Sequence, residues 1–390
     1  MNDGYRYVVL GAGRQGTAAA YDLARMGQAA EVVLADADLE HAQRSARRVN
    51  QLLQHPVARA VQVDVREGEA LRRLLEPADG ALSAVPYFFN LGITQAAIEA
   101  RTHLCDMGGH TETVFRQLEL DEAARQAGVS IVPDCGMGPG LINTISAYII
   151  ETLDEAYEVR IYDGGLPKHP RPPWNYSLLF HINGLTNEYY GTTVLLIDGE
   201  LTEVEGLTGY ERLTIPPLGE LEAFITTGGA STAPWTFRGK VRTYINKTLR
   251  YPGHYAWFRA YKELGLFELD PVEVHGTPVV PRDVFHALLE PKLYDPEVRD
   301  LALIHVIGTG RKHGREVKLI VDVYDEYDEA TEFRAMERLT GWHCATMLAL
   351  QVQGTVKPGA VPQEIAVAPQ RVLDGLRARG IAIRETWEKA

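Results

Sequence analysis

The sequence predicts an α/β protein in which a doubly wound parallel sheet is followed by an α+β domain with a large mixed or antiparallel sheet. Short buried strands alternate with helices through the first third of the chain, and a glycine-rich turn follows the first strand. From about Asp134 this alternation gives way to strands with frequent turns. A chain of 390 residues also exceeds the usual domain length of about 100–200 residues, so two hydrophobic cores are expected.

Six short apolar runs rich in β-branched residues are typical of buried parallel strands. They are Arg6–Leu10, Glu31–Ala35, Val61–Val65, Gly80–Val85, His103–Met107 and Val129–Pro133. Five segments between them have helical periodicity, and Gly27 and Gly128 suit the ends of the first and the last. These helices are Gln15–Met26, Leu39–Leu53, Glu67–Glu76, Asn90–Ala100 and Val114–Gln126. Right-handed crossovers between such strands place a ligand crevice at their carboxyl ends.

The second part of the chain is predicted to be mostly antiparallel. Its expected strands are Glu158–Tyr162, Thr193–Ile197, Leu221–Thr226, Lys240–Leu249 and Glu316–Tyr324. Short helices are expected over Arg282–Leu289 and Pro296–Leu303, and a long loop over the proline-rich stretch Gly165–Pro173. Its class is therefore α+β.

A last helical pattern, over Thr331–Gln353, carries small residues at four-residue spacing. Gly341, Ala345 and Ala349 would let this helix pack closely on another element, and we expect it to rejoin the first domain. The predicted organisation is a dinucleotide-binding domain over residues 1–136, a substrate-binding and dimerisation domain over residues 137–330, and a returning segment over residues 331–390.

Composition restricts the classes of partner. A net charge of −13 disfavours a nucleic-acid or anionic-membrane surface, so a small-molecule partner is expected. The three cysteines are isolated, and no dense set of histidines, cysteines or carboxylates predicts a metal. The N-terminus lacks the pattern of a secretion signal, and no apolar run reaches the roughly 18 residues of a membrane span. We therefore expect a cytoplasmic protein.

The segment Gly11-Ala12-Gly13-Arg14-Gln15-Gly16 places G-x-G-x-x-G between a predicted strand and a predicted helix. The glycines suit a tight turn, close approach of a pyrophosphate and helix–strand packing, in that order. Asp36, at the end of the second strand, follows Gly16 by the twenty positions expected of a ribose-binding acid. Its charge would repel a 2′-phosphate, so NAD is predicted and NADP is less favoured.

Residues at the ends of the later strands are expected to face the cofactor. Asp64 and Val65 end the third strand, where Asp64 would meet the adenine or cap the next helix. Ala84, Val85 and Pro86 end the fourth and precede Tyr87, which suits either proton transfer or plain packing. Asp106 precedes two glycines and is favoured as a functional carboxylate. Cys135 suits a buried filler, with a role in proton transfer left open.

The chain resembles the saccharopine dehydrogenase-like oxidoreductases, and within them the lysine 6-dehydrogenase group. The likeness rests on VLGAGRQG with Asp36, on DMGGH at Asp106–His110, on PDCGMGPGLIN at Pro133–Asn143 and on TLRYPGH at Thr248–His254. It covers nearly the whole chain. The resemblance implies a Rossmann domain completed by the C-terminal segment, together with a substrate domain on a mixed sheet. Cys135 departs from the apolar residue expected there, which puts a required catalytic thiol in doubt.

The resemblance also implies a reaction, in which a lysine ε-amine is oxidised by hydride transfer to NAD and hydrolysed to a semialdehyde and ammonia. Asp106 is expected to take the amine proton, with Tyr87 as a relay and His181 as a further alternative. Arg250 is the preferred clamp for the substrate carboxylate. Further expected substrate contacts are His181, Asn183, His254 and Thr227.

Two other functions remain open. One is a condensing reductase of the saccharopine or carboxynorspermidine dehydrogenase type, which uses the same hydride chemistry in reverse. The other is a non-catalytic NAD-binding regulator, which would keep the glycines and Asp36 but need no base. In each case a homodimer or larger homo-oligomer is expected, because exposed strand edges often pair across a two-fold axis.

Overall fold

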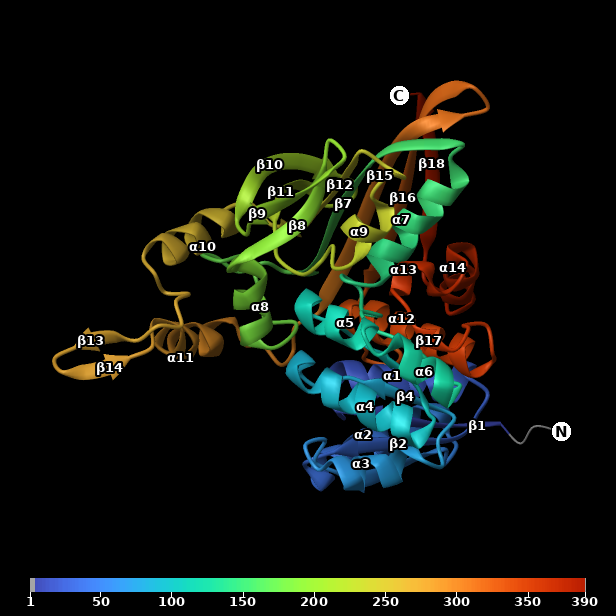
Figure 1. Ribbon diagram of the computed structural model, residues 1–390. Coiled ribbons are helices and arrows are strands. Elements are labelled where there is room, and N and C mark those ends of the chain that lie inside the picture. The colour runs from blue at the N-terminus through green and yellow to red at the C-terminus, as the bar shows by residue number, and fades with distance from the viewer. Residues whose placement is uncertain (1–3, 390) are drawn as a thin grey trace.

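The computed structural model describes residues 4–389 and contains a seven-stranded parallel sheet in the order β17-β6-β5-β4-β1-β2-β3 (Figure 1). Its strands are β1 (Tyr5–Leu10), β2 (Ala29–Asp36), β3 (Ala58–Gln62), β4 (Gly80–Ser83), β5 (His103–Asp106), β6 (Ser130–Val132) and β17 (Gly359–Ala360). The predicted doubly wound parallel sheet is confirmed. The third strand lies earlier than predicted, because the chain leaves the ladder after Gln62 and turns where Arg66 N–H bonds to Asp64.

Helices cover both faces of this first sheet, and we call the sheet with its helices the first domain. They are α1 (Arg14–Met26), α2 (Leu39–Leu53), α3 (Gly68–Leu75), α4 (Asn90–Ala100), α5 (Thr111–Leu118) and α6 (Asp121–Ala127). The single helix predicted over Val114–Gln126 is wrong, since the chain breaks at Glu119 and Leu120. The side chain of Gln117 is turned inward before this break and donates to Asp106.

The second sheet has nine strands, and we call the part of the chain built around it the second domain. Its central order is β10-β11-β12-β7-β15-β16-β18, with β8 pairing with β12 and β9. The strands are β7 (Glu155–Pro167), β8 (Thr192–Ile197), β9 (Glu200–Glu205), β10 (Thr208–Ile215), β11 (Gly219–Ile225), β12 (Thr243–Arg250), β15 (Asp300–Lys312), β16 (Arg315–Glu326) and β18 (Ile383–Lys389). Only β7 and β12 run parallel among the central pairs, so the sheet is mixed as predicted.

Two local predictions in this part are corrected. The helix expected over Pro296–Leu303 is wrong, because Asp300 begins β15, which pairs with β7 on one side and β16 on the other. Pairing on both edges outweighs a short local helical pattern. The loop expected over Gly165–Pro173 begins after Pro167, where β7 ends.

The C-terminal segment belongs to both sheets. Helix α12 (Ala335–Val352) packs on α1, and a Cβ atom on Gly341 would lie 2.9 Å from Ala19 N. The small residue therefore permits the close packing that its spacing predicts. After β17, helices α13 (Gln363–Ala366) and α14 (Pro369–Ala378) lead to β18, which pairs with β16. The prediction that all of residues 331–390 return to the first domain is thus corrected, because β18 extends the second sheet.

The remaining elements lie between or beside the two sheets. They are η1 (Tyr87–Phe89), α7 (Leu141–Thr152), α8 (Ile182–Tyr189), α9 (Ala233–Phe237), α10 (His254–Glu263), β13 (Val272–Val274), β14 (Thr277–Val279) and α11 (Pro281–Leu293). Figure 1 shows α10, α11 and the β13–β14 hairpin projecting to one side of the body. Within residues 4–389, no helix combines the length and apolarity needed to cross a membrane.

Candidate active site

The glycine-rich turn after β1 has the geometry of a dinucleotide-binding loop. Gly11 has φ +92°, and a Cβ atom there would lie 2.7 Å from Ala84 O. A Cβ on Gly16 would lie 1.9 Å from Gly11 O, so this position requires glycine for packing alone. A Cβ on Gly13 would meet nothing within 4 Å. The open side of the turn is therefore at Gly13, where a pyrophosphate would approach the start of α1.

Asp36 lies where a ribose-binding carboxylate is expected. Its Oδ2 accepts a hydrogen bond from Ala12 N–H at 2.8 Å, and its Oδ1 accepts one from Asp38 N–H at 3.0 Å. These bonds fix the carboxylate beside the glycine-rich turn. Arg14 and Gln15 begin α1 and are partly buried. Burial lowers the pKa of Arg14.

The predicted role of Asp64 at the adenine is not supported by its contacts. Its Oδ1 accepts from both the backbone and the side chain of Arg66 at 2.9 Å. These bonds lower the pKa of Asp64 to about 2. The carboxylate therefore fastens its own turn after β3, while Val65 is half-buried beside the core of the first domain.

The loop after β4 touches the glycine-rich turn. Val85 Cγ1 would lie 3.0 Å from a Cβ atom on Gly11, and Ala84 N–H donates to Leu10 O. Pro86 follows and is exposed. Tyr87 is half-buried, and its ring stacks on His110 with centroids 4.6 Å apart and planes 9° apart. Tyr87 and His110 thus lie together beyond the carboxyl ends of β4 and β5, as expected of residues near a nicotinamide.

Asp106 is a buried residue whose carboxylate accepts hydrogen bonds from three donors of the protein. It is 0% exposed, and its Oδ1 accepts from Gly108 N–H at 2.8 Å and from Asp134 N–H at 3.1 Å. Its Oδ2 accepts from Gln117 Nε2 at 2.8 Å, and burial raises its pKa. The prediction that Asp106 takes a proton directly from substrate is corrected, because its carboxylate is enclosed by these three donors. It instead fixes the loops that follow β5 and β6.

Asp134 lies at a strand end that the sequence places near the nicotinamide, but the sequence pattern predicts no catalytic role for it there. It has φ +62°, a left-handed conformation that is uncommon outside glycine. Asp134 is 2% exposed, and its Oδ2 accepts from Ser231 Oγ of the second domain. Its Oδ1 is buried against Gly108 without a hydrogen bond of ordinary geometry, while the backbone of Gly109 acts on the carboxylate. Burial and the neighbouring Asp106 carboxylate raise the pKa of Asp134 to about 8. A strand end followed by a glycine-rich run was the signal that could have identified it, as it did Asp106.

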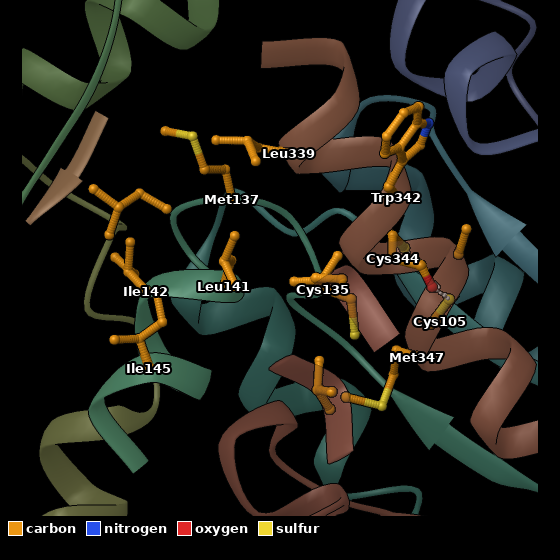
Figure 2. Packing of buried hydrophobic residues seen from close by; sticks show 14 of the residues in the cluster. Cys105, Cys135, Met137, Leu141, Ile142, Ile145, Leu339, Trp342, Cys344 and Met347 are labelled. Atoms are coloured by element: carbon orange, nitrogen blue, oxygen red, sulfur yellow. Dashed lines mark hydrogen bonds between the residues drawn. The ribbon is translucent and has the colours of Figure 1, made fainter. Parts of the chain in front are cut away.

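The side chain of Cys135 points into the hydrophobic core, away from the contact between Asp134 and Ser231. Its thiol is 0% exposed and donates to Val132 O at 3.3 Å. Figure 2 shows it with Cys105, Cys344 and Met347 beside α12. Burial raises the pKa of the Cys135 thiol well above its usual range. The open alternative of proton transfer is therefore corrected in favour of a buried filler.

In the second domain, Arg250 belongs to an internal hydrogen-bonded chain. Its Nε donates to the Tyr189 hydroxyl at 2.9 Å, and Tyr189 bonds to His254 Nε2, also at 2.9 Å. Burial and Arg250 lower the pKa of His254, so the ring is neutral, and its Nδ1 donates to Trp174 O. Both nitrogens of His254 are thus used, and its predicted contact with substrate is corrected to support of Tyr189 and Arg250.

The charge of Arg250 is also matched within the protein. Arg250 Nη2 lies 3.2 Å from Glu188 Oε2, and the guanidinium is 2% exposed. Asp163, on β7, accepts a hydrogen bond from Asn246 Nδ2 at 2.6 Å, and burial raises the pKa of Asp163 to about 6. Arg250 also acts electrostatically on Asp163. Glu188 thus matches the charge of Arg250, so this group does not offer the free positive charge of the predicted clamp.

The other predicted substrate residues lie around α8 and the loop after β11. His181 is exposed and caps α8, where its Nδ1 accepts from Asn183 N–H, and Asn183 is also exposed. Thr227 Oγ1 donates to Asn187 O at 2.6 Å, so its hydroxyl ties the loop to α8. Within residues 4–389, none of these three side chains forms a hydrogen bond with Tyr87 or Asp134.

Comparison with protein families covers almost the whole chain. The family model for the saccharopine dehydrogenase NADP binding domain matches residues 7–132, and that for the saccharopine dehydrogenase C-terminal domain matches residues 136–381. The chain belongs to the saccharopine dehydrogenase family. The apo, histidine-tagged saccharopine dehydrogenase (L-Glu forming) from Saccharomyces cerevisiae has a similar fold. It superposes with a TM-score of 0.80 at 17% identity, covering 99% of this chain and 100% of that one.

Curated members of the family are distant in sequence. The saccharopine dehydrogenase [NADP(+), L-glutamate-forming] of Schizosaccharomyces pombe is 24% identical over 226 residues, which cover 55% of this chain and 49% of that protein. The match thus spans about half the length of that relative. Carboxynorspermidine synthase of Vibrio alginolyticus is 24% identical over 295 residues, covering 72% of this chain and 69% of that protein. The two family models establish the family, and identities this low do not fix the substrate.

Proposed function

We propose that this protein is an NAD-dependent oxidoreductase that deaminates the side-chain amine of an amino acid, with the ε-amine of L-lysine as the first candidate. One observation carries the proposal. The Asp134 carboxylate, with a raised pKa and one unpartnered oxygen, follows β6 of the same sheet that bears the dinucleotide loop. Such a carboxylate at the carboxyl ends of the strands suits removal of a proton beside a bound nicotinamide.

The glycine-rich turn fits a dinucleotide. Gly13 leaves open space beside the start of α1, and Asp36 presents a fixed carboxylate at the end of β2. The chemistry that NAD supplies when bound is acceptance of a hydride from the substrate carbon. Gly11, Gly13 and Gly16 would hold the pyrophosphate, and Asp36 would bind the ribose hydroxyls.

A side chain of the protein can remove the proton of the substrate amine. A free lysine amine has a pKa near 10.4, and hydride leaves readily only when this amine is neutral. Asp134 would accept the proton, with its backbone held by Asp106 and its carboxylate by Ser231. The substrate C–H bond then breaks with its electron pair, and a carbon–nitrogen double bond forms. Water adds to this imine to give the semialdehyde and ammonia, and the α-amine can close a ring to 1-piperideine-6-carboxylate.

The local charge favours a basic substrate. Asp134, Asp163 and Glu188 lie near the junction of the two domains, while Arg250 is the cation that pairs with Glu188. The loop that contains Gly229 and Ser231 connects the Asp134 and Asp163 regions. A Cβ atom on Gly229 would lie 2.1 Å from Oδ1 of Asn246, which bonds to Asp163, and Ser231 bonds to Asp134. Above pH 8, where Asp134 is ionised, this excess of carboxylates suits an additional ammonium group and disfavours a substrate with several carboxylates.

A condensing reductase is the second candidate. The relatives favour it, since they include a saccharopine dehydrogenase and a carboxynorspermidine synthase. The same hydride chemistry would then run from an imine to a secondary amine. A non-catalytic NAD-binding protein would need neither the strained backbone of Asp134 nor its unpartnered oxygen, so it is the weaker alternative.

The deciding experiment is an assay of NADH and ammonia with NAD and L-lysine at alkaline pH, run in parallel with saccharopine. We expect equal amounts of NADH and ammonia from lysine. Formation of NADH from saccharopine but not from lysine would favour the condensing reductase instead. Binding of NAD without turnover of either would favour the non-catalytic alternative.

The cofactor preference gives a separate prediction. The family model and the fission-yeast relative carry NADP in their names, whereas Asp36 supports NAD here because a carboxylate repels a 2′-phosphate. Asp36→Ser should weaken NAD binding and strengthen NADP binding by about tenfold each, or about 1.4 kcal/mol. Fluorescence titration with NADH and NADPH measures both. Tighter binding of NADPH than of NADH to the unmodified protein would contradict the preference.

We further propose a homo-oligomer in the cytoplasm. Leu264, Leu269 and Leu288 are large apolar side chains exposed on the projecting part around α10 and α11, at 75%, 56% and 64%. Exposed apolar groups of this kind suit a subunit contact. The three free cysteines suit a reducing compartment.

A further inference from the structure

Arg282, near the start of α11, is a buried cation outside the residues considered so far. It is 6% exposed, and its Nε donates to Phe267 O at 2.8 Å. Its Nη1 donates to Asn187 Oδ1 at 3.0 Å, and the guanidinium carbon lies 4.6 Å from the centre of the Tyr190 ring. Each of these partners is neutral.

Glu268 and Asp283 act electrostatically on Arg282, but neither carboxylate pairs with it directly. The Nη2 atom of Arg282 is buried and without a hydrogen-bond partner, and Arg282 forms no ion pair within residues 4–389. The nearby Glu268 carboxylate accepts from the Tyr190 hydroxyl instead. By contrast, the buried Arg379 pairs with Asp22 at 2.7 Å. Because a buried charge without a counterion is costly, an unmatched guanidinium indicates a site for an external anion.

The surroundings of Arg282 connect it to the candidate active site. Asn187 accepts from Arg282, while the next residue in α8, Glu188, binds Arg250. Two adjacent residues at the end of α8 thus bind two different arginines. Arg250 is paired with a carboxylate, whereas Arg282 is bound by a neutral amide. The backbone carbonyl of Asn187 accepts from Thr227 Oγ1, and the loop after Thr227 carries Ser231, whose hydroxyl donates to Asp134. Arg282 is thus connected through Asn187 to the second-domain loop that meets Asp134 of the first domain.

We propose that Arg282 binds the carboxylate of the amino-acid substrate, in place of Arg250. This assignment rests on the proposed function and identifies which end of the substrate each part of the junction recognises. A planar guanidinium matches a carboxylate, and the unpartnered Nη2 supplies the donors for it. The carboxylate-rich side, with Asp134 and Asp163, would then receive the amine end. Arg250 becomes a positioning residue for Tyr189 and Glu188.

The test compares L-lysine with cadaverine, which has the same amine but no carboxylate. In Arg282→Gln, we expect the KM for lysine to rise about 10- to 100-fold, as for loss of a charged hydrogen bond. The KM for cadaverine should stay unchanged, so that the preference for lysine falls by the same factor. Arg282→Lys keeps the charge and should show an intermediate loss. Arg238→Gln, which removes an exposed arginine paired with Glu200, is the matched control.

Comparing two substrates within one variant separates recognition from folding, because partial unfolding would lower both activities equally. Calorimetric titration of L-lysine and of saccharopine in the presence of NADH measures binding without turnover. If either compound binds the unmodified protein more tightly than it binds Arg282→Gln, the assignment of Arg282 is supported. This holds even if the protein does not deaminate lysine. Equal affinities in the two proteins, or failure of both compounds to bind the unmodified protein, would overturn it.

Discussion

Asp134→Asn is expected to lower amine oxidation by about 10²–10⁴-fold while NAD still binds, because an amide cannot accept the amine proton. The replacement keeps the size and shape of the side chain, so the contact with Ser231 can persist. Steady-state NADH formation and a fluorescence titration with NADH measure the two properties. The pH profile adds an independent test. With a pKa of about 8, Asp134 becomes an active base as the pH rises through that value.

The neighbouring residues supply controls for Asp134. Cys135→Ala should retain turnover, because its thiol lies in the core, and should cost only stability. Asp106→Asn should disturb the loops that its carboxylate holds, and its effect should include a lower Tm. If Asp134→Asn kept normal turnover and the same pH profile, proton removal would have to be assigned to Tyr87 or another group.

Gly16→Ala is expected to abolish dinucleotide binding and to lower the free energy of unfolding by about 1–3 kcal/mol. The added Cβ would lie 1.9 Å from Gly11 O, so either the turn or α1 must move. Because this movement occurs where the backbone would approach the pyrophosphate, stability and binding should fall together. Thermal unfolding and titration with NADH measure the two effects.

Gly13→Ala is the matched comparison for Gly16→Ala. A methyl group there meets nothing within 4 Å, so the Tm should stay close to that of the unmodified protein. Affinity for the dinucleotide should nevertheless fall, since the methyl group occupies the open side of the turn. Normal affinity in Gly13→Ala would show that the pyrophosphate does not approach this position.

Local sequence was sufficient for the parts of the fold that depend on local pattern. The helices over Leu39–Leu53 and Asn90–Ala100 have the predicted bounds. The first parallel sheet followed from the βαβ alternation, because each buried strand carries its own apolar run. Gly11 and Gly16 were identified by spacing, and the close contacts at these positions give the physical reason. The pairing of β18 with β16 was missed, because a strand in Ile383–Lys389 is specified by its partner in the sheet.

The sequence by itself determined the class of fold, the position of the glycine-rich turn and the resemblance to a family that the comparisons confirm. Only the tertiary structure distinguished residues of the same type. Asp106 and Asp134 both end strands before glycines and both are buried, yet Asp106 is held by three donors of its own domain while Asp134 bonds to Ser231 of the second domain. Arg250 and Arg282 are both buried, yet only Arg250 has a carboxylate partner. The role of a charged group depends on which distant groups surround it, and the folded chain decides that.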